Sequence, residues 1–208
     1  MSTQIHLIFA TNNAHKFTEI AAYFANSSLR ISSLLDFPDI PEAPEPFHTF
    51  QENAQAKAEF VREQLYRIDA SVINAHTWIV SDDSGLEVHA LQGAPGVHSK
   101  RYTPEATAIA NNNKLLHELE NNTDRRAQFR CVLAIAKQNA IEFVEGICVG
   151  FIAEHPTGNH GFGYDPIFIP QEYPTRSMAD LSMEEKNSIS HRGRALEKLR
   201  ELIEKQSI

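Results

Sequence analysis

The sequence predicts an α/β fold with a mixed β-sheet, and three observations indicate it. Short apolar runs at residues 5–10 and 78–80 have the length of buried strands, and polar residues follow each of them. Segments with apolar side chains at helical spacing alternate with these runs. Two longer strand-like runs, 126–136 and 142–153, are separated by a short polar connection, which predicts an antiparallel hairpin. Strands that alternate with helices around such a hairpin are typical of an α/β domain with a mixed sheet.

The first half of the chain alternates strands and helices. The helix after the first strand is indicated by apolar side chains at i, i+3, i+4 and i+7, beginning at Phe17. Four prolines and three carboxylates in residues 37–47 predict an extended loop. In chain order we expect a strand at 5–10, a helix at 16–24, the loop at 37–47, a helix at 49–68, a strand at 78–80, an acidic turn at 81–85 and a strand at 86–91.

The second half contains the hairpin and two more helices. Thr103 and Pro104 have the residue types of an N-cap and a first helical position. Ser182 followed by Glu185 is a capping-box pattern. In chain order we expect a turn at 93–96, a helix at 104–119, strands at 126–136 and 142–153, a glycine-rich segment at 158–170, and one helix from 182 to about 205.

Length, composition and charge limit the class of protein. The 208 residues are enough for one sizeable domain, so we expect a single domain over residues 1–208. A formal charge of −8 argues against non-specific binding to nucleic acid or to an anionic membrane. No signal peptide or membrane span is indicated, so the expected location is the cytoplasm. Cys131 and Cys148 lie in apolar runs and are expected as buried free thiols, with a disulfide or a zinc site as the alternative.

Residues 11–16 follow the first strand and enter the first helix. Free backbone N–H groups at a helix start, with polar side chains and a lysine, suit a phosphate group. The alternative is a plain helix cap, because Thr and Asn are common at that position. The candidate phosphate-binding residues are Thr11, Asn12, Asn13, Ala14, His15 and Lys16.

Asp82 and Asp83 follow an apolar strand, where ligands of α/β sheets commonly bind. Adjacent carboxylates of an extended backbone point to opposite sides. Hard oxygen ligands beside phosphate suit Mg²⁺, which takes one or two carboxylates. Glu42 and Glu45 in the proline-rich loop are candidates for a further carboxylate, and an Asp-rich turn without ligand is the alternative.

Two further segments carry aromatic, glycine and basic residues. In residues 161–166 two glycines flank Phe162, which allows close backbone approach to a ligand and stacking on a base. Residues 186–193 offer cations and donors for phosphates or for a base carbonyl, although a basic helix start is often a solvated face. The candidate residues are Phe162, Gly163, Tyr164, Asp165, Lys186, His191 and Arg192. Together with the acids, these segments describe the binding of a nucleotide polyphosphate with Mg²⁺.

The chain resembles the inosine triphosphate pyrophosphatase family, also called XTP/dITP diphosphatases. The resemblance runs from residue 9 to residue 196 and is carried, in order, by FATNNAHKFTEI, TFQENAQAKA, SDDSGLEVHALQGAPGVHSKRY, RRAQFRCVL, GFGYDPIF and EEKNSISHRGRAL. It implies an elongated, two-lobed α/β fold with a central mixed sheet flanked by helices, a deep cleft between the lobes, and a homodimer. It also implies hydrolysis of ITP, dITP and XTP to the monophosphate and pyrophosphate, with Mg²⁺ as cofactor.

The resemblance assigns roles to single residues. It gives Asp83 the roles of general base and metal ligand and makes Ser84 a substrate contact. It places phosphate binding on residues 11–16 and base binding on residues 162–165, with the remaining substrate contacts on Lys186, His191 and Arg192. Where many relatives carry Glu-Glu-Thr-Gly, this chain has Pro44-Glu45-Pro46-Phe47, so the second metal ligand stays open between Glu42 and Glu45. A non-catalytic nucleotide-binding module and a phosphatase that removes the γ-phosphate are the rival functions.

Overall fold

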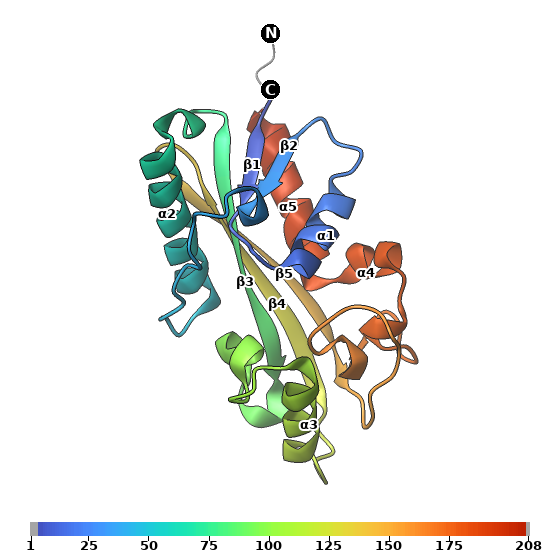
Figure 1. Cartoon of the computed structure of the whole chain (residues 1–208). Coiled ribbons are helices and arrows are strands. Elements are labelled where there is room, and N and C mark those ends of the chain that lie inside the picture. Colours follow the sequence, from blue (N-terminus) through green and yellow to red (C-terminus); the bar gives the residue numbers. More distant parts are fainter. Residues whose placement is uncertain (1–3, 207–208) are drawn as a thin grey trace. The chain divides into compact units, whose positions relative to one another are not determined.

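The computed structural model describes residues 4–206 and contains a six-stranded sheet in the order β2-β1-β3-β4-β5-β6 (Figure 1). β1 pairs in parallel with β2 and with β3, whereas β5 pairs antiparallel with β6, so the sheet is mixed. The expected α/β fold with a mixed sheet is therefore confirmed. The strands are β1 (His6–Phe9), β2 (Arg30–Ser33), β3 (Thr77–Val88), β4 (Arg126–Ala136), β5 (Ile141–Ile152) and β6 (Phe168–Pro170).

The helices follow the predicted order, except that one expected helix starts later and another is divided into two. The α-helices of the described residues are α1 (Ala14–Tyr23), α2 (Phe50–Ile68), α3 (Ala108–Glu118), α4 (Met183–Ile189) and α5 (His191–Gln206). No helix within residues 4–206 is long and apolar enough to cross a membrane. Cys131 and Cys148 are buried and form no disulfide within residues 4–206, as expected.

The chain divides into two compact units that share secondary-structure elements. Unit 1 comprises Met1–Asp83, Val132–Glu145 and Lys198–Ile208, and unit 2 comprises Ser84–Cys131 and Gly146–Glu197. β3, β4, β5 and α5 each contribute residues to both units. The division in β3 falls at the peptide bond between Asp83 and Ser84.

Unit 1 is built around β1, which lies between β2 and β3. Phe9 at the end of β1 is in register with Val80 of β3, and the Ala10 N–H donates to the Val80 carbonyl at 2.8 Å. The residues that follow Phe9 therefore lie beside the residues that follow Val80. Figure 1 shows α2 on one side of these strands and α1 on the other. Buried apolar side chains of this unit include Leu7, Ile8, Phe9, Ile20, Val61, Leu65, Trp78, Ile79, Val80, Leu133, Ile135 and Leu199.

Unit 2 has a core of its own, to which strands, α3 and the glycine-rich segment contribute. Phe129 of β4 packs on Phe168 of β6, with ring centres 4.6 Å apart. Tyr164 belongs to the same buried cluster and donates its hydroxyl to the Ser99 carbonyl at 3.0 Å. The other members of this core are Leu86, Val88, Leu115, Leu119, Ala127, Cys148, Ile152, Ile167, Met178, Leu181 and Ile189.

The expected acidic turn at residues 81–85 was wrong, because β3 continues through it without a break from Thr77 to Val88. Ser81, Asp82 and Asp83 are all buried in this strand. Burial of an acid is costly unless a cation or a donor compensates it, so two adjacent acids in a sequence usually indicate a surface turn. Here two lysines of neighbouring helices supply that compensation, as described below.

The start of α3 also differs from the expected one. The predicted start of a helix at Pro104 was wrong: α3 begins at Ala108, and Thr107 is its N-cap and accepts from the Ala110 N–H. Thr103 instead bonds the Asn111 side chain through both its N–H and its hydroxyl.

The single helix expected from residue 182 to about 205 is two helices. Ser182 and Glu185 form the predicted capping box of α4. Ser190 then adopts an extended conformation and accepts from the Gly193 N–H at 3.0 Å, so that α5 starts anew. A Cβ at Gly193 would lie 1.8 Å from the Asn187 carbonyl oxygen, so the tight junction requires glycine there.

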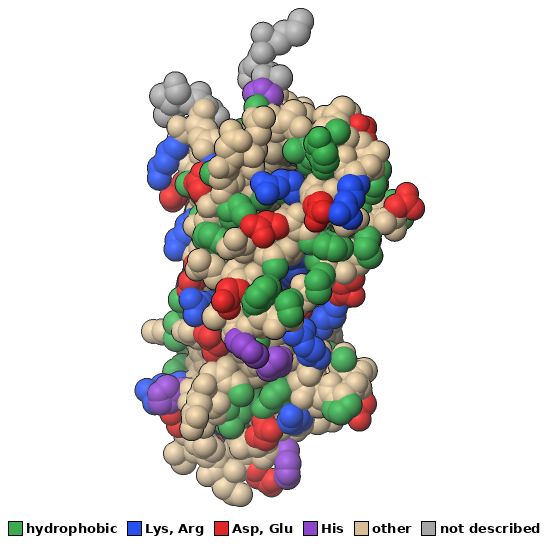
Figure 2. Space-filling model, turned by 90° about the vertical axis from the view of Figure 1, so that its left-hand side faces the viewer, with side chains coloured by type: hydrophobic (Ala, Val, Ile, Leu, Met, Phe, Trp, Pro, Cys, Tyr) green, Lys and Arg blue, Asp and Glu red, His purple; other side chains and the backbone are tan. Residues whose placement is uncertain are grey.

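Charged side chains of both signs are interspersed over the face drawn in Figure 2. On this face the described Lys and Arg residues do not gather into one continuous basic patch. This distribution agrees with the net charge of −8.

Candidate functional site

The side chains of β3 alternate between two faces, and this alternation separates the two acids. On one face, the Ser81 hydroxyl donates to the Ala54 carbonyl of α2. On the other face, Asp82 pairs through Oδ1 with the Lys16 ammonium of α1. Asp83 is the next residue and therefore shares the α2 side with Ser81. The two adjacent acids consequently have different partners.

Lys16 reaches Asp82 because α1 begins at the carboxyl end of β1. The register of β1 with β3 places that end beside Asp82. Asp82 is buried and Lys16 is half-buried, so their pairing compensates the buried carboxylate. Lys16 thus lies at the predicted phosphate-binding segment and holds one acid of the predicted metal site.

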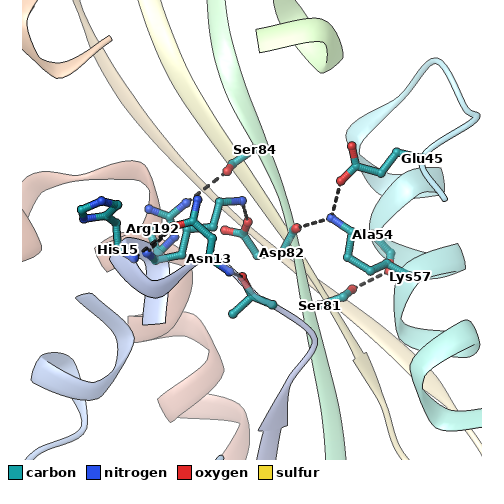
Figure 3. A network of polar contacts seen from close by, with 11 residues as sticks. Asn13, His15, Glu45, Ala54, Lys57, Ser81, Asp82, Ser84 and Arg192 are labelled. Atoms are coloured by element: carbon teal, nitrogen blue, oxygen red, sulfur yellow. Dashed lines mark hydrogen bonds and ion pairs between the residues drawn. The ribbon is translucent and has the colours of Figure 1, made fainter. Parts of the chain in front are cut away.

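Lys57 of α2 is a residue of this site that the sequence reasoning missed. Its ammonium lies 2.7 Å from Oε1 of Glu45 and donates to the Asp82 carbonyl at 3.0 Å (Figure 3). Burial would lower the pKa of this amine, but the nearby carboxylates of Glu45, Asp83 and Asp82 outweigh burial and raise it. Lys57 is therefore a fixed positive charge among three acids. Its sequence signal is its place among buried helix positions of α2 that include Ala54, Ala58 and Val61.

Asp83 is a buried acid of this group whose charge is compensated only in part. Its side chain is buried, the residue being 6% exposed, and Oδ2 has no hydrogen-bond partner among the described residues. Burial raises the pKa of Asp83 to about 6, with Glu45 and Asp82 acting in the same direction and Lys57 and Lys16 opposing it. A buried carboxylate oxygen that accepts no hydrogen bond can serve as a ligand of a cation or as a proton acceptor.

The residues around Asp83 fit a magnesium ion rather than a metal held by protein ligands alone. No group of three or more His, Cys, Asp and Glu side chains within residues 4–206 is placed to hold a metal. Mg²⁺ usually takes one or two carboxylates and completes its shell with waters and substrate oxygens. Asp83 and Glu45 supply that number of carboxylates. Glu45 is half-buried and interacts electrostatically with Asp83, whereas Glu42 is exposed, so the structure favours Glu45 over Glu42.

The start of α1 is capped by its own side chains. The Asn13 side chain accepts from the His15 N–H at 3.0 Å and from the Lys16 N–H at 3.2 Å. The Thr11 hydroxyl accepts from the Asn13 N–H at 3.1 Å. The helix-cap interpretation is therefore confirmed, and a phosphate that uses these backbone N–H groups would have to displace the Asn13 side chain. Of the other predicted residues, Asn12, Ala14 and His15 are exposed.

In unit 2, Lys186 and Asp165 form a buried ion pair beneath Phe162. The Lys186 ammonium lies 2.7 Å from Oδ2 of Asp165, which also accepts from the Phe162 N–H at 2.7 Å. The same ammonium lies 4.8 Å from the centre of the Phe162 ring. This half-buried ring is therefore held over a cation, in an arrangement suited to stacking on a flat, electron-rich group.

Arg192 and His191 are buried as well, so the alternative of a solvated basic face was wrong. The Arg192 guanidinium donates to the Ser84 hydroxyl at 3.1 Å (Figure 3) and its Cζ lies 5.9 Å from the Phe162 ring centre. The His191 ring stacks on Phe129 with ring centres 4.7 Å apart. These donors lie at the start of α5, and each rests against an aromatic ring.

The glycines around Phe162 have different spatial requirements. Gly161 has φ +75°, and a Cβ there would lie 2.1 Å from Oδ2 of Asp165. Gly163 has φ +61°, but no atom lies within 4 Å of its Cβ position. The first glycine therefore makes room for the buried ion pair, whereas the second is needed only for its backbone conformation. Tyr164, also predicted to contact substrate, has its ring in the core.

The chain matches the model of the Ham1 family over residues 7–202. It belongs to the Ham1 family. This membership confirms the family that the sequence motifs indicate.

Curated and solved Ham1 relatives match nearly the whole chain. A dITP/XTP pyrophosphatase of Geobacillus kaustophilus is 47% identical over 202 residues, covering 94% of this chain and 92% of the relative. A protein of the same name from Bacillus cereus is 44% identical over 209 aligned positions, covering 98% and 97%. The structure of a HAM1 protein from Coxiella burnetii is 35% identical, has a TM-score of 0.83 and covers 97% of this chain and 100% of that chain.

Proposed function

We propose that this protein hydrolyses deaminated purine nucleoside triphosphates, namely ITP, dITP and XTP, to the nucleoside monophosphate and pyrophosphate. Relatives named dITP/XTP pyrophosphatase, at 44–47% identity over nearly the whole chain, support this activity. The structural observation that carries the proposal is Asp83, a buried acid with a raised pKa and an oxygen without a hydrogen-bond partner among residues 4–206. Perturbed acids of this kind are typical of catalytic sites.

In this proposal Asp83 and Glu45 hold Mg²⁺. When bound, Mg²⁺ neutralises charge on the triphosphate oxygens. Asp83 accepts the proton of the water that attacks the α-phosphorus, and the bond from that phosphorus to the oxygen bridging to the β-phosphorus breaks. Without the metal, burial raises the pKa of Asp83 to about 6, so its carboxylate is a stronger base than that of an ordinary aspartate. The positive charges of Lys16 and Lys57 stabilise the negative charge that develops on the phosphates.

The base chemistry of the proposal belongs to unit 2. Phe162 stacks on the purine, and donors from His191 and Arg192 bond the 6-keto oxygen. Adenine presents an amino group at that position, so a donor would face a donor and each unpaired buried group would cost roughly 1–3 kcal/mol. The protein should therefore prefer 6-keto purines over adenine.

Product analysis tests the function directly. Purified protein is incubated with ITP and Mg²⁺, with and without EDTA, and the nucleotide and phosphate products are separated. We expect IMP and pyrophosphate, and no turnover with EDTA. IDP with orthophosphate would identify a γ-phosphatase, and bound but unchanged ITP would identify a binding module. Equal kcat/KM values for ATP and ITP would refute the proposed base selectivity.

We further propose that the protein forms a homodimer, which the sequence resemblance implies. Val149 and Phe151 point outward from β5 and are 46% and 45% exposed, so unit 2 has an apolar face that a second copy can cover. Light scattering of the wild type and of Phe151→Lys tests this, with a monomeric mass expected only for the variant. The cytoplasmic location stays a prediction, which cell fractionation would test.

A further inference from the structure

Asn53 of α2 fixes the backbone of the acidic loop at one residue. Its Oδ1 accepts from the Phe47 N–H at 2.9 Å, and its Nδ2 donates to the Phe47 carbonyl at 3.2 Å. One side-chain amide thus pairs both backbone groups of Phe47, as a neighbouring strand would. Asn53 is only 1% exposed, so this pairing takes place away from water, where loss of either partner is costly.

The fixed point lies two residues from Glu45. Pro46 disfavours the helical conformation for Glu45, which precedes it. Pro44 does the same for Ala43, so this part of the loop stays extended. Two residues of chain span at most about 7 Å, so the position of Phe47 limits where the Glu45 carboxylate can lie. A loop that is pinned at Phe47 and stiffened by proline has little freedom at Glu45.

A second residue of α2 holds the side chain of Glu45. Lys57 follows Asn53 by four residues, and side chains at this spacing lie on the same helix face. Lys57 pairs with Glu45 and bonds the Asp82 carbonyl of β3. Asn53 and Lys57, one helical turn apart, therefore fix three parts of the site: the loop backbone, the Glu45 carboxylate and the strand that bears Asp83.

We propose that Asn53 is a positioning residue for the metal: it sets the location of Glu45 relative to Asp83 by clamping the backbone of Phe47. This inference rests on the proposed function, in which Glu45 and Asp83 hold Mg²⁺. All five residues that carry the argument, namely Glu45, Phe47, Asn53, Lys57 and Asp83, belong to unit 1. Asn53 itself touches neither substrate nor metal, so its effect is on metal affinity.

The experiment compares two substitutions with a matched control. Asn53→Asp keeps the acceptor for the Phe47 N–H but opposes a carboxylate to the Phe47 carbonyl, and Asn53→Ala removes both bonds. The control is Asn111→Ala in unit 2, because Asn111 is also a buried asparagine that bonds a loop backbone, accepting from the Thr103 N–H at 2.9 Å and donating to the Ser99 carbonyl at 3.3 Å. Hydrogen exchange of the Phe47 amide reports the clamp itself and should accelerate in Asn53→Ala, but much less in Asn53→Asp, which keeps the acceptor for the Phe47 N–H.

Metal affinity is measured without nucleotide, by titrating Mn²⁺ alone and following its paramagnetic resonance signal. We expect affinity to fall about 10-fold or more in Asn53→Ala, the range typical of residues that orient a metal ligand, and by a smaller factor in Asn53→Asp. Asn111→Ala should bind Mn²⁺ as the wild type does. In ITP hydrolysis, the Mg²⁺ concentration for half-maximal rate should rise by the same factor, with kcat restored at saturating Mg²⁺.

The outcomes separate this inference from the proposed function. Wild-type Mn²⁺ affinity in both Asn53 variants, or a kcat loss that excess Mg²⁺ does not restore, would overturn the positioning role and leave the function intact. Glu45→Gln is measured alongside. If Glu45→Gln binds Mn²⁺ as the wild type does, Glu45 is not a ligand, and both the proposed metal site and this inference fail. Asn53→Asp preserves the side-chain volume and one bond, so it provides the comparison should Asn53→Ala not fold.

Discussion

The ammonium of Lys186 lies 2.7 Å from Oδ2 of Asp165, and both side chains are buried. Asp165→Asn would leave the lysine charge buried without its counter-ion. We expect a loss of about 3–5 kcal/mol in the free energy of unfolding. Denaturant titration measures it, with Glu63→Gln as control, because that variant breaks the exposed Arg67–Glu63 pair and should cost at most about 1 kcal/mol. Equal losses in the two variants would contradict the expectation.

Asp83→Asn should lower kcat for ITP by about 10²–10⁴-fold, because the amide cannot accept the proton of the attacking water. Asp82→Asn serves as the comparison. It weakens the hold on Lys16 and should raise KM more than it lowers kcat. Steady-state kinetics with nucleotide binding measured separately distinguishes the two effects. Near-normal turnover in Asp83→Asn would remove this residue from the mechanism.

The raised pKa of Asp83 makes the stability of the metal-free protein depend on pH. Between the ordinary value of 3.8 and the folded-state pKa of about 6, the folded protein binds more protons at this site than the unfolded chain does. The contribution of Asp83 to the free energy of unfolding therefore decreases as pH rises through this window, by about 3 kcal/mol in total.

Unfolding in EDTA at pH 4 to pH 7 tests this dependence. The difference in unfolding free energy between the wild type and Asp83→Asn isolates the contribution of Asp83. As pH rises, the unfolding free energy of the wild type should fall relative to that of Asp83→Asn. A constant difference across the range would show that burial does not raise the pKa of Asp83.

Gly161→Ala and Gly163→Ala should differ in severity although both glycines have positive φ. Alanine at residue 163 would meet no neighbouring atom. The free energy of unfolding should therefore fall only by the roughly 1–2 kcal/mol that a left-handed backbone conformation costs. Alanine at residue 161 would also meet Oδ2 of Asp165 and must shift the Phe162 backbone. We expect KM for ITP to rise more in Gly161→Ala, and thermal unfolding with kinetics checks both effects. A milder effect at residue 161 would mean that the loop adapts.

Cys148 should resist alkylation in the folded protein. Burial raises the pKa of its thiol from 9.0 to about 12, so at pH 8 the reactive thiolate is roughly a thousandfold scarcer than for an ordinary thiol. Titration with a thiol reagent should be slow in buffer and should detect both cysteines in guanidinium. Fast labelling of Cys148 in buffer would contradict its burial.

Most of the fold could be predicted because strand and helix periodicities are local. β4 was predicted with its observed limits, and the capping box at Ser182 identified the start of α4. The errors arose where tertiary contacts override local preference. Two adjacent acids suggested a turn because the sequence does not show that Lys16 and Lys57 lie beside them. The break at Ser190 likewise depends on a contact between Asn187 and Gly193 that periodicity does not reveal.

The candidate site was accessible from sequence only in part. Motif resemblance pointed to Asp83, Lys16 and Lys186, because these residue types follow element ends in a recognisable order. Lys57 was missed because a lysine in a mostly polar helix normally indicates a solvated face. The preference for Glu45 over Glu42 depends on the position of that lysine, which only the folded chain provides.

The division of the chain at the Asp83–Ser84 peptide bond has a consequence for how such an enzyme can be changed. Each unit is assembled from discontinuous segments, and β3, β4, β5 and α5 pass from one unit into the other. Gene fusion exchanges contiguous stretches of chain, so it cannot graft one unit onto another protein. Neither unit can therefore be transferred whole as one contiguous piece of chain. A change of base preference in this architecture therefore calls for substitutions within unit 2 rather than exchange of the whole unit.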